Sequence, residues 1–258
     1  MSEPVLGIIG VGELALYTIR GLRQGGYEQK ILLGPRNNEK SRWLAQHMNC
    51  EVKADNQAVV DHSDLIMIAT RPPQCLQALA GLKFKSTQTL ISVVAGIPRE
   101  HIRAALNQPI EIVRAMPVSS AEVGASPALV FPAHPEVCQL FAHCGEAIPV
   151  TEESTFESGT VHACAYSWFF ALFEELIQAT ESAALPRELA TQLVAGMARG
   201  AAELTRSKPE LTPGQIASEI ATEGTYSRLG LELIKKNKGL ARWHEACALL
   251  SQKLDIKF

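Results

Sequence analysis

Short runs of apolar residues alternate with longer mixed segments through the first part of the chain. These runs occur at residues 5–9, 30–33, 65–69 and 89–94. Continuous apolar runs are typical of parallel strands that are buried on both faces. Further strands are predicted at 110–114, 129–131 and 146–150, and helices at 38–48, 74–82 and 99–106. In the first of these helices, Trp43 and Leu44 are expected to face inward. The alternation predicts an α/β doubly wound sheet through about residue 150.

The pattern changes after residue 150, where no segment reads convincingly as a strand. Residues that start helices stand there instead. Thr151 precedes two glutamates, Pro186 can occupy a first helical turn, and Thr212 followed by Pro213 is typical of a helix start. The sequence therefore predicts two domains, a sheet domain at 1–150 and an all-α domain at 151–258.

The first helix of the second domain is predicted from about 152 to 183, which is roughly 45 Å at 1.5 Å per residue. Between 161 and 177 it is apolar on nearly every face, and such a helix must be enclosed. A domain of roughly 100 residues offers few neighbours to cover it, so we expect a homodimer through the C-terminal helices. A central helix in a monomeric bundle is the alternative.

Composition narrows the class of protein. The 258 residues are 47% hydrophobic and 20% charged, which is an ordinary globular balance. A net charge of −3 does not indicate a basic surface that would bind nucleic acid or anionic lipid. The most apolar stretch, 161–173, is too short to span a membrane, and the N-terminus lacks the basic segment of a signal peptide. We expect no nucleic-acid partner and no membrane association.

The six cysteines are scattered along the chain. No C-x-x-C pair or Cys/His ligand cluster occurs among them, so no metal site is predicted. Such cysteines are typical of reduced thiols in a cytoplasmic protein.

A glycine turn follows the first predicted strand. Gly10, Gly12 and Ala15 form the pattern G-x-G-x-x-A between an apolar run and a helical segment, which is the context of a dinucleotide-binding turn in a Rossmann-type domain. Gly10 permits the turn, Gly12 lets a pyrophosphate approach the backbone, and Ala15 lets the helix pack closely. The helix start, with Glu13 and Leu14, offers free N–H groups. A glycine turn in an ordinary βα unit is the alternative.

The end of the second predicted strand bears on the choice of cofactor. NAD-specific sites carry an acidic residue there that binds the ribose 2′-hydroxyl, but this chain has no carboxylate before Glu39. Arg36 can pair with a 2′-phosphate, with help from Asn37, Lys40 and Ser41. The sequence favours NADPH over NADH, the alternative being that Arg36 is a solvated loop residue.

Several further motifs follow the glycine turn in one order. They are Asn56 with residues 62–65, Ala69-Thr70-Arg71-Pro72, residues 92–97, Arg114-Ala115-Met116-Pro117, Leu185-Pro186 and residues 213–216. This ordered set resembles the pyrroline-5-carboxylate reductase family over nearly the whole chain. The resemblance implies a Rossmann domain followed by a helical dimerisation domain. It also implies an NADPH-dependent enzyme that reduces the cyclic imine 1-pyrroline-5-carboxylate to L-proline, the last step of proline biosynthesis.

The resemblance also implies roles for individual residues. Asn56 would contact the adenosine half of the cofactor. Glu210 falls where the family has an acidic residue near the substrate amine, the alternative being a solvated loop acid. The residues implied to line the nicotinamide side of the pocket are Ala69, Thr70, Arg71, Pro72, Ala95 and Gly96.

Departures from the family pattern cluster on the substrate side. Residues 162–166 replace Ser-Gly-Ser-Gly-Pro, residues 222–227 replace Ser-Pro-Gly-Gly-Thr-Thr, and residues 118–120 replace the end of Met-Pro-Asn-Thr-Pro. His162 among them is either a packed core histidine or a proton donor. A divergent substrate is therefore an open alternative.

The loop at 223–227 precedes a helical run to residue 234, so backbone N–H groups around Gly224 and Thr225 would seat a substrate carboxylate. Ser227 is the candidate to hydrogen-bond or protonate the ring nitrogen, and Tyr226 either donates a proton or closes the pocket. Glu223 would repel a carboxylate unless it points to solvent, but it could pair with a cationic amine. Alternatively, Thr225 and Ser227 only cap the helix.

Three functions remain open from the sequence. The first is an oxidoreductase acting on CH–NH groups, with NADPH as cofactor and 1-pyrroline-5-carboxylate as substrate. The second is a reductase of another imine or a carbonyl compound on the same architecture. The third is a non-catalytic NADP-binding regulatory dimer.

Overall fold

A computed structural model of the chain describes residues 3–35, 38–181, 184–254 and 256. The chain divides into two compact units, Met1–Ala163 and Cys164–Phe258. A helix that begins at Glu153 continues from the first unit into the second. The domain boundary at residue 150 stays a prediction, since the division by contacts falls within this helix rather than before it.

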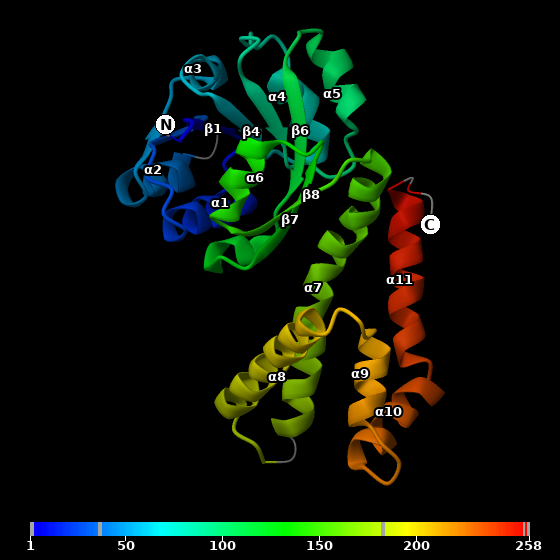
Figure 1. The fold of residues 1–258 in the computed structure, drawn as a ribbon. Coiled ribbons are helices and arrows are strands. Elements are labelled where there is room, and N and C mark those ends of the chain that lie inside the picture. Colours follow the sequence, from blue (N-terminus) through cyan, green and yellow to red (C-terminus); the bar gives the residue numbers. More distant parts are fainter. Residues whose placement is uncertain (1–2, 36–37, 182–183, 255, 257–258) are drawn as a thin grey trace. The chain divides into compact units, whose positions relative to one another are not determined.

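Within the described residues, the first unit contains a sheet whose strand order is β3-β2-β1-β4-β5-β6-β7-β8 (Figure 1). β6 and β7 run antiparallel, and the other neighbouring strands run parallel. The strands are β1 (Leu6–Ile9), β2 (Ile31–Leu33), β3 (Cys50–Val52), β4 (Leu65–Ile68), β5 (Thr89–Ser92), β6 (Glu111–Met116), β7 (Ser126–Phe131) and β8 (Gly145–Pro149). The order reverses between β1 and β4, which is where open α/β sheets bind ligands.

Helices cover both faces of this sheet. They are α1 (Glu13–Gln24), α2 (Asn38–His47), α3 (Asn56–Asp61), α4 (Cys75–Leu79), α5 (Arg99–Leu106) and α6 (Pro135–Ala142), with 3₁₀ turns η1 (Pro72–Gln74) and η2 (Ser119–Val123). Leu6 and Ile8 of β1 share a core with α1, α2 and α6, whereas Ile9 shares a core with α3, α4 and α5. Because both faces are covered, β1, β2 and β4 are buried and apolar along their length. The predicted α/β doubly wound fold is confirmed.

Some sequence expectations need correction. Leu44 is fully buried, but Trp43 is 37% exposed, so the prediction that both face inward is wrong for Trp43. Successive residues of a helix point about 100° apart, so Trp43 lies at the edge of the face on which Leu44 is buried. Trp43 instead stacks on His47, with ring centroids 4.7 Å apart, and under the guanidinium of Arg20. The short elements β3, α3 and α6 were not predicted.

A buried arginine of β6 forms ion pairs with the first turns of α7 (Glu153–Glu181). The side chain of Arg114 is completely buried, and its Nη1 donates to Glu153 Oε1 at 3.0 Å and to Glu157 Oε1. Its guanidinium lies 4.5 Å from the centre of the Phe156 ring. Nε and Nη2 of Arg114 have no hydrogen-bond partner among the described residues. One cation thus holds two carboxylates on successive turns of α7.

The second unit is helical, as predicted. After α7 it contains α8 (Arg187–Ser207), α9 (Pro213–Ile220), α10 (Tyr226–Lys236) and α11 (Gly239–Lys253). Thr212 caps α9 in a capping box with Gln215, which confirms the predicted helix start. None of the described helices combines the length and the apolarity that crossing a membrane requires. Among the described residues, no group of three or more His, Cys, Asp and Glu side chains is arranged to hold a metal ion.

The cysteines are unpaired thiols. Burial raises the pKa of Cys50 and of Cys75 to about 11 and that of Cys144 to about 12. A buried neutral thiol behaves as a small apolar side chain, so these residues serve the core and not catalysis.

Candidate active site

The turn between β1 and α1 treats its two glycines differently. Gly10 has a φ of +95°, and a Cβ there would lie 2.7 Å from Thr70 Cγ2 and 2.8 Å from Thr70 N. A Cβ at Gly12 would meet no atom within 4 Å. The backbone therefore requires glycine at position 10, whereas the space beside Gly12 is open to a ligand. Gly12 is the N-cap of α1, so the N–H groups of this helix face that space.

A hollow of about 160 Å³ lies at this turn. The residues that line it are Gly10, Val11, Gly12, Ala69, Thr70, Arg71 and Gln74. They come together because β1 and β4 are neighbouring parallel strands whose following turns share one edge of the sheet. Thr70 Oγ1 is buried and has no hydrogen-bond partner among the described residues. Val11 and Gln74 were not predicted to contact a cofactor, because neither residue type by itself indicates such a contact.

Other predicted cofactor residues lie around the same edge. Asn56 is the first residue of α3, and its Oδ1 would lie 2.8 Å from a Cβ on Gly34, just after β2. Ala95 and Gly96 follow β5, next to β4, and Gly96 has a φ of +72°. The remaining predicted positions are Leu14, half-buried in α1, Ala15, fully buried there, and Pro72, exposed at the start of η1.

Glu13 and Arg36 are two charged residues among those predicted to bind the cofactor. Glu13 opens α1, and its carboxylate forms an ion pair with Nζ of Lys40 in α2. Arg36 and Asn37, on which the choice of NADPH was based, lie outside the described residues. All of these assignments to a cofactor remain predictions.

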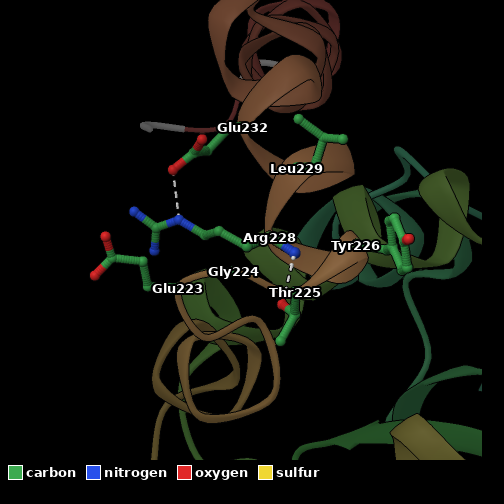
Figure 2. Close-up of a pocket in the computed structure, with 7 residues that line it drawn as sticks. All are labelled: Glu223, Gly224, Thr225, Tyr226, Arg228, Leu229 and Glu232. Carbon is green, nitrogen blue, oxygen red and sulfur yellow. Dashed lines mark hydrogen bonds and ion pairs between the residues drawn. The ribbon is translucent and has the colours of Figure 1, made fainter.

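The loop before α10 borders a second hollow, of about 720 Å³ (Figure 2). Its lining residues are Glu223, Gly224, Thr225, Tyr226, Arg228, Leu229 and Glu232. Thr225 Oγ1 accepts from the Arg228 N–H at 3.2 Å and donates to Thr222 O at 2.7 Å, so Thr225 caps α10. Gly224 has a φ of +81°, which favours glycine there.

Charged side chains gather on one side of this hollow. Figure 2 shows the Arg228 guanidinium on the same side as the carboxylates of Glu223 and Glu232, whereas the Tyr226 ring points away from them. Nε of Arg228 donates to Glu232 Oε1 one helical turn later. Neither residue was predicted, although an Arg and a Glu at this spacing are readable from the sequence.

The predicted catalytic and amine-binding residues are accessible. Tyr226 is 94% exposed. Ser227, the second residue of α10, is exposed and is not among the residues that line the hollow. Glu210 is exposed between α8 and α9, and His162 is exposed on α7, so His162 is not packed within the described chain. Their roles remain predictions.

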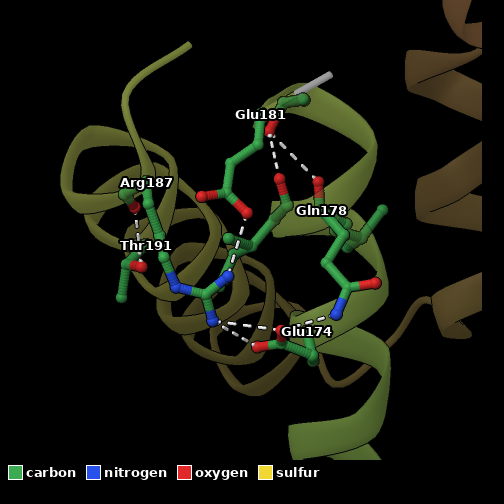
Figure 3. Close-up of polar contacts among 8 residues, drawn as sticks. Glu174, Gln178, Glu181, Arg187 and Thr191 are labelled. Carbon is green, nitrogen blue, oxygen red and sulfur yellow. Dashed lines mark hydrogen bonds and ion pairs between the residues drawn. The ribbon is translucent and has the colours of Figure 1, made fainter. Parts of the chain in front are cut away.

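An ion cluster joins α7 to α8 in the second unit (Figure 3). Arg187 donates through Nη2 to both oxygens of Glu174, at 2.7 and 3.0 Å, and through Nη1 to Glu181 at 2.9 Å. The hydrogen bond from Arg187 lowers the pKa of Glu174. The ion pair is therefore present at neutral pH and is lost as acid protonates Glu174.

The same two helices, α7 and α8, also line an apolar groove. The groove has a volume of about 720 Å³. Phe169 and Phe170 on its wall are 49% and 54% exposed, and Leu176 on the same helix is 48% exposed. Large apolar side chains exposed together mark an interaction surface.

Comparison with known proteins shows what this architecture is similar to. Residues 5–96 match the model of the family described as "NADP oxidoreductase coenzyme F420-dependent", and residues 152–253 match that of pyrroline-5-carboxylate reductase dimerisation. A pyrroline-5-carboxylate reductase from Pseudomonas aeruginosa is 29% identical over 98% of this chain and 96% of its own length. One from Arabidopsis thaliana is 26% identical over 90% of this chain and 87% of its own. In sequence, the chain is thus similar to pyrroline-5-carboxylate reductases along nearly its whole length.

Solved structures agree with this family in fold. The Streptococcus pyogenes 1-pyrroline-5-carboxylate reductase superposes with a TM-score of 0.87 at 22% identity, over 98% of this chain and 99% of that one. A Plasmodium falciparum pyrroline carboxylate reductase, with NADP bound, gives 0.88 at 21% identity over 98% of each chain. The chain therefore has the fold of these two reductases along its length.

Proposed function

We propose that this protein reduces 1-pyrroline-5-carboxylate to L-proline with NADPH as the hydride donor. The observation that carries the proposal is an open dinucleotide turn in the same chain as a pyrroline-5-carboxylate reductase dimerisation domain. The similarity to the Pseudomonas aeruginosa enzyme covers 98% of the chain and so includes both parts.

The residues at the edge of the sheet fit a bound NADPH, which would supply the hydride. The open space at Gly12 and the N–H groups of α1 suit the pyrophosphate. The unpaired Thr70 Oγ1 provides a hydrogen-bonding group for the nicotinamide side, with Arg71 beside it. Asn56 takes the adenosine side, and Arg36 pairs with the 2′-phosphate, which makes NADPH the preferred cofactor.

The loop before α10 seats the substrate in this proposal. The side chain of Thr225, the N-cap of α10, accepts a hydrogen bond from the Arg228 N–H, and Thr225 O accepts one from the Leu229 N–H. The N–H groups of Tyr226 and Ser227, in the first turn of the helix, would then bind the substrate carboxylate. The Ser227 hydroxyl holds the proton at the ring nitrogen during hydride transfer. Positioning of this kind is the main contribution that a protein makes to hydride transfer.

The proposal extends to assembly and location. A second copy of the chain would cover the exposed Phe169, Phe170 and Leu176 of α7, as the dimerisation domain suggests. The unpaired cysteines suit a reducing, cytoplasmic compartment.

A pair of substrates tests the carboxylate seat. With NADPH, 1-pyrroline-5-carboxylate is expected to turn over at about 1 to 1,000 per second, the ordinary range for enzymes. 1-Pyrroline, which has the same ring without the carboxylate, is expected to show a kcat/KM lower by about tenfold or more, because it lacks one charge-assisted interaction. Initial rates of NADPH oxidation measure both. Equal values of kcat/KM would contradict the carboxylate seat.

Replacing Ser227 by alanine tests the proton-holding role. We expect kcat to fall by about a hundredfold, the lower end of what a positioned acid–base group contributes, while the Kd of NADPH stays unchanged. Ser218→Ala is the matched control, because Ser218 is also an exposed helical serine, and its hydroxyl donates to Gly214 O within its own helix. Unchanged kcat in Ser227→Ala would remove Ser227 from the mechanism without removing the reductase function.

One observation favours a second candidate, reduction of another imine on the same site. The hollow at α10 holds two carboxylates, Glu223 and Glu232, around a single guanidinium. This charge balance suits a substrate with an additional amine. A panel of cyclic imines with and without amino groups, assayed with NADPH, separates the two: the second candidate requires a higher kcat/KM for an amine-bearing imine.

A further inference from the structure

An ion pair bridges the two helices that follow β1 and β2. Glu13 is the first residue of α1, directly after Gly12, and Lys40 is in the first turn of α2. The Glu13 carboxylate and the Lys40 ammonium are in contact, with 59% of the Glu13 side chain and 30% of the Lys40 side chain exposed. The same helices meet further along, where Arg20 lies 5.1 Å from the centre of the Trp43 ring. The pair therefore stands between two packed helices.

The position of this pair relates it to the cofactor. β1 and β2 are neighbouring parallel strands, and the Gly34 N–H after β2 donates to Ile8 O in β1 at 2.9 Å. A dinucleotide on such a sheet places its pyrophosphate at the start of the helix after β1 and its adenosine ribose near the end of β2. Lys40 follows the end of β2, and its ammonium is held at the start of α1. It therefore lies within reach of the 2′-phosphate position.

The charges of the pair act in opposite directions on a phosphate. Lys40 attracts it, and Glu13, only one residue beyond the pyrophosphate turn, repels it. A phosphomonoester carries about −1.5 to −2 charges at neutral pH. NADH and NADPH share the pyrophosphate, so the difference between them at this pair comes from the 2′-phosphate, which NADH replaces by a hydroxyl.

We propose that Glu13 competes with the 2′-phosphate of NADPH for Lys40, so that this ion pair adjusts the preference for NADPH over NADH that Arg36 provides in the proposed function. Lys40 is a specificity-determining residue that contacts the 2′-phosphate. Glu13 is the counter-anion that occupies Lys40 when the site is free and weakens the hold on the phosphate when NADPH binds. The inference rests on the proposed function only in its choice of cofactor.

Equilibrium binding without an imine substrate tests the inference, so absence of turnover would leave it standing. The Kd values of NADPH, NADH and adenosine 2′,5′-bisphosphate are measured by calorimetry at fixed ionic strength. Lys40→Met is expected to raise the Kd of NADPH and of the bisphosphate by about tenfold or more. The Kd of NADH is expected to rise by less than about twofold. Glu13→Gln is expected to tighten the binding of NADPH and of the bisphosphate by about threefold to fivefold, and the binding of NADH by clearly less, because NADH lacks the 2′-phosphate.

A matched control separates this effect from a general change of charge. Glu122→Gln also removes a carboxylate that pairs with a residue of α1, in this case Arg20, and it should leave all three Kd values unchanged. In the double variant of Glu13→Gln with Lys40→Met, the tightening by the first change should be lost. Equal effects of Glu13→Gln on NADPH and NADH, or tighter NADPH binding that persists without Lys40, would overturn the inference.

Discussion

Replacing Gly12 by valine is expected to weaken NADPH binding by about a hundredfold and to abolish turnover at ordinary cofactor concentrations. In the free protein a Cβ at this position meets no atom within 4 Å, and the backbone, with a φ of −98°, suits any residue. The added methyl groups would occupy space that the pyrophosphate needs, and overpacking of this kind costs about 1–3 kcal/mol. The unfolding free energy should change by no more than about 1 kcal/mol, the cost of a poorer N-cap.

Gly10→Ala is the informative comparison for Gly12→Val. A Cβ at Gly10 would collide with Thr70, and φ there is +95°, so this variant should lose stability as well as binding. Cofactor titration and urea denaturation of both variants therefore separate a ligand contact from a backbone requirement. Normal NADPH affinity in Gly12→Val would show that the cofactor does not approach this turn.

Replacing Arg114 by methionine is expected to lower the free energy of unfolding by about 3 kcal/mol. Removing one partner of a buried ion pair costs about 3–5 kcal/mol, because the other charge remains without compensation. The lower end applies here because the side chains of Glu153 and Glu157 are 34% and 20% exposed and can be partly hydrated. The contact between the guanidinium and the Phe156 ring is lost as well.

A triple variant tests the cause of that loss. Adding Glu153→Gln and Glu157→Gln to Arg114→Met removes the uncompensated charges, so part of the stability should return. Urea denaturation at one fixed protomer concentration gives the comparison, because subunit association would otherwise shift the midpoint. If the triple variant is less stable than Arg114→Met alone, repulsion between unpaired carboxylates is not the cause.

Much of the fold could be predicted because its signals are local. β1, β4 and β5 lie in the middle of a sheet covered on both faces, and burial on both faces makes a strand continuously apolar. The helical half follows from helix-starting residues such as Thr212. The short β3, in which only Cys50 is buried, has no such signal. The prediction for Trp43 was wrong because the sequence around it does not show that the side chain of Arg20, from another helix, covers its ring.

The candidate site was predictable to the same extent. The glycine turn and the loop before α10 are contiguous in sequence, and Gly10 and Gly12 line one hollow while residues 223–226 line another. The pairing of Glu13 with Lys40, and of Arg114 with Glu157, joins residues far apart in the chain, and only the tertiary fold brings them together. Arg228 could have been noted, since its partner Glu232 is one turn away on the same helix.

The most direct test of the reductase function is to add 1-pyrroline-5-carboxylate to the purified protein with NADPH and to measure NADPH consumed and L-proline formed in the same samples. The proposed function predicts one L-proline for each NADPH oxidised, with the rate lost in Gly12→Val. Tight binding of NADPH without its oxidation, or oxidation without L-proline, would contradict it.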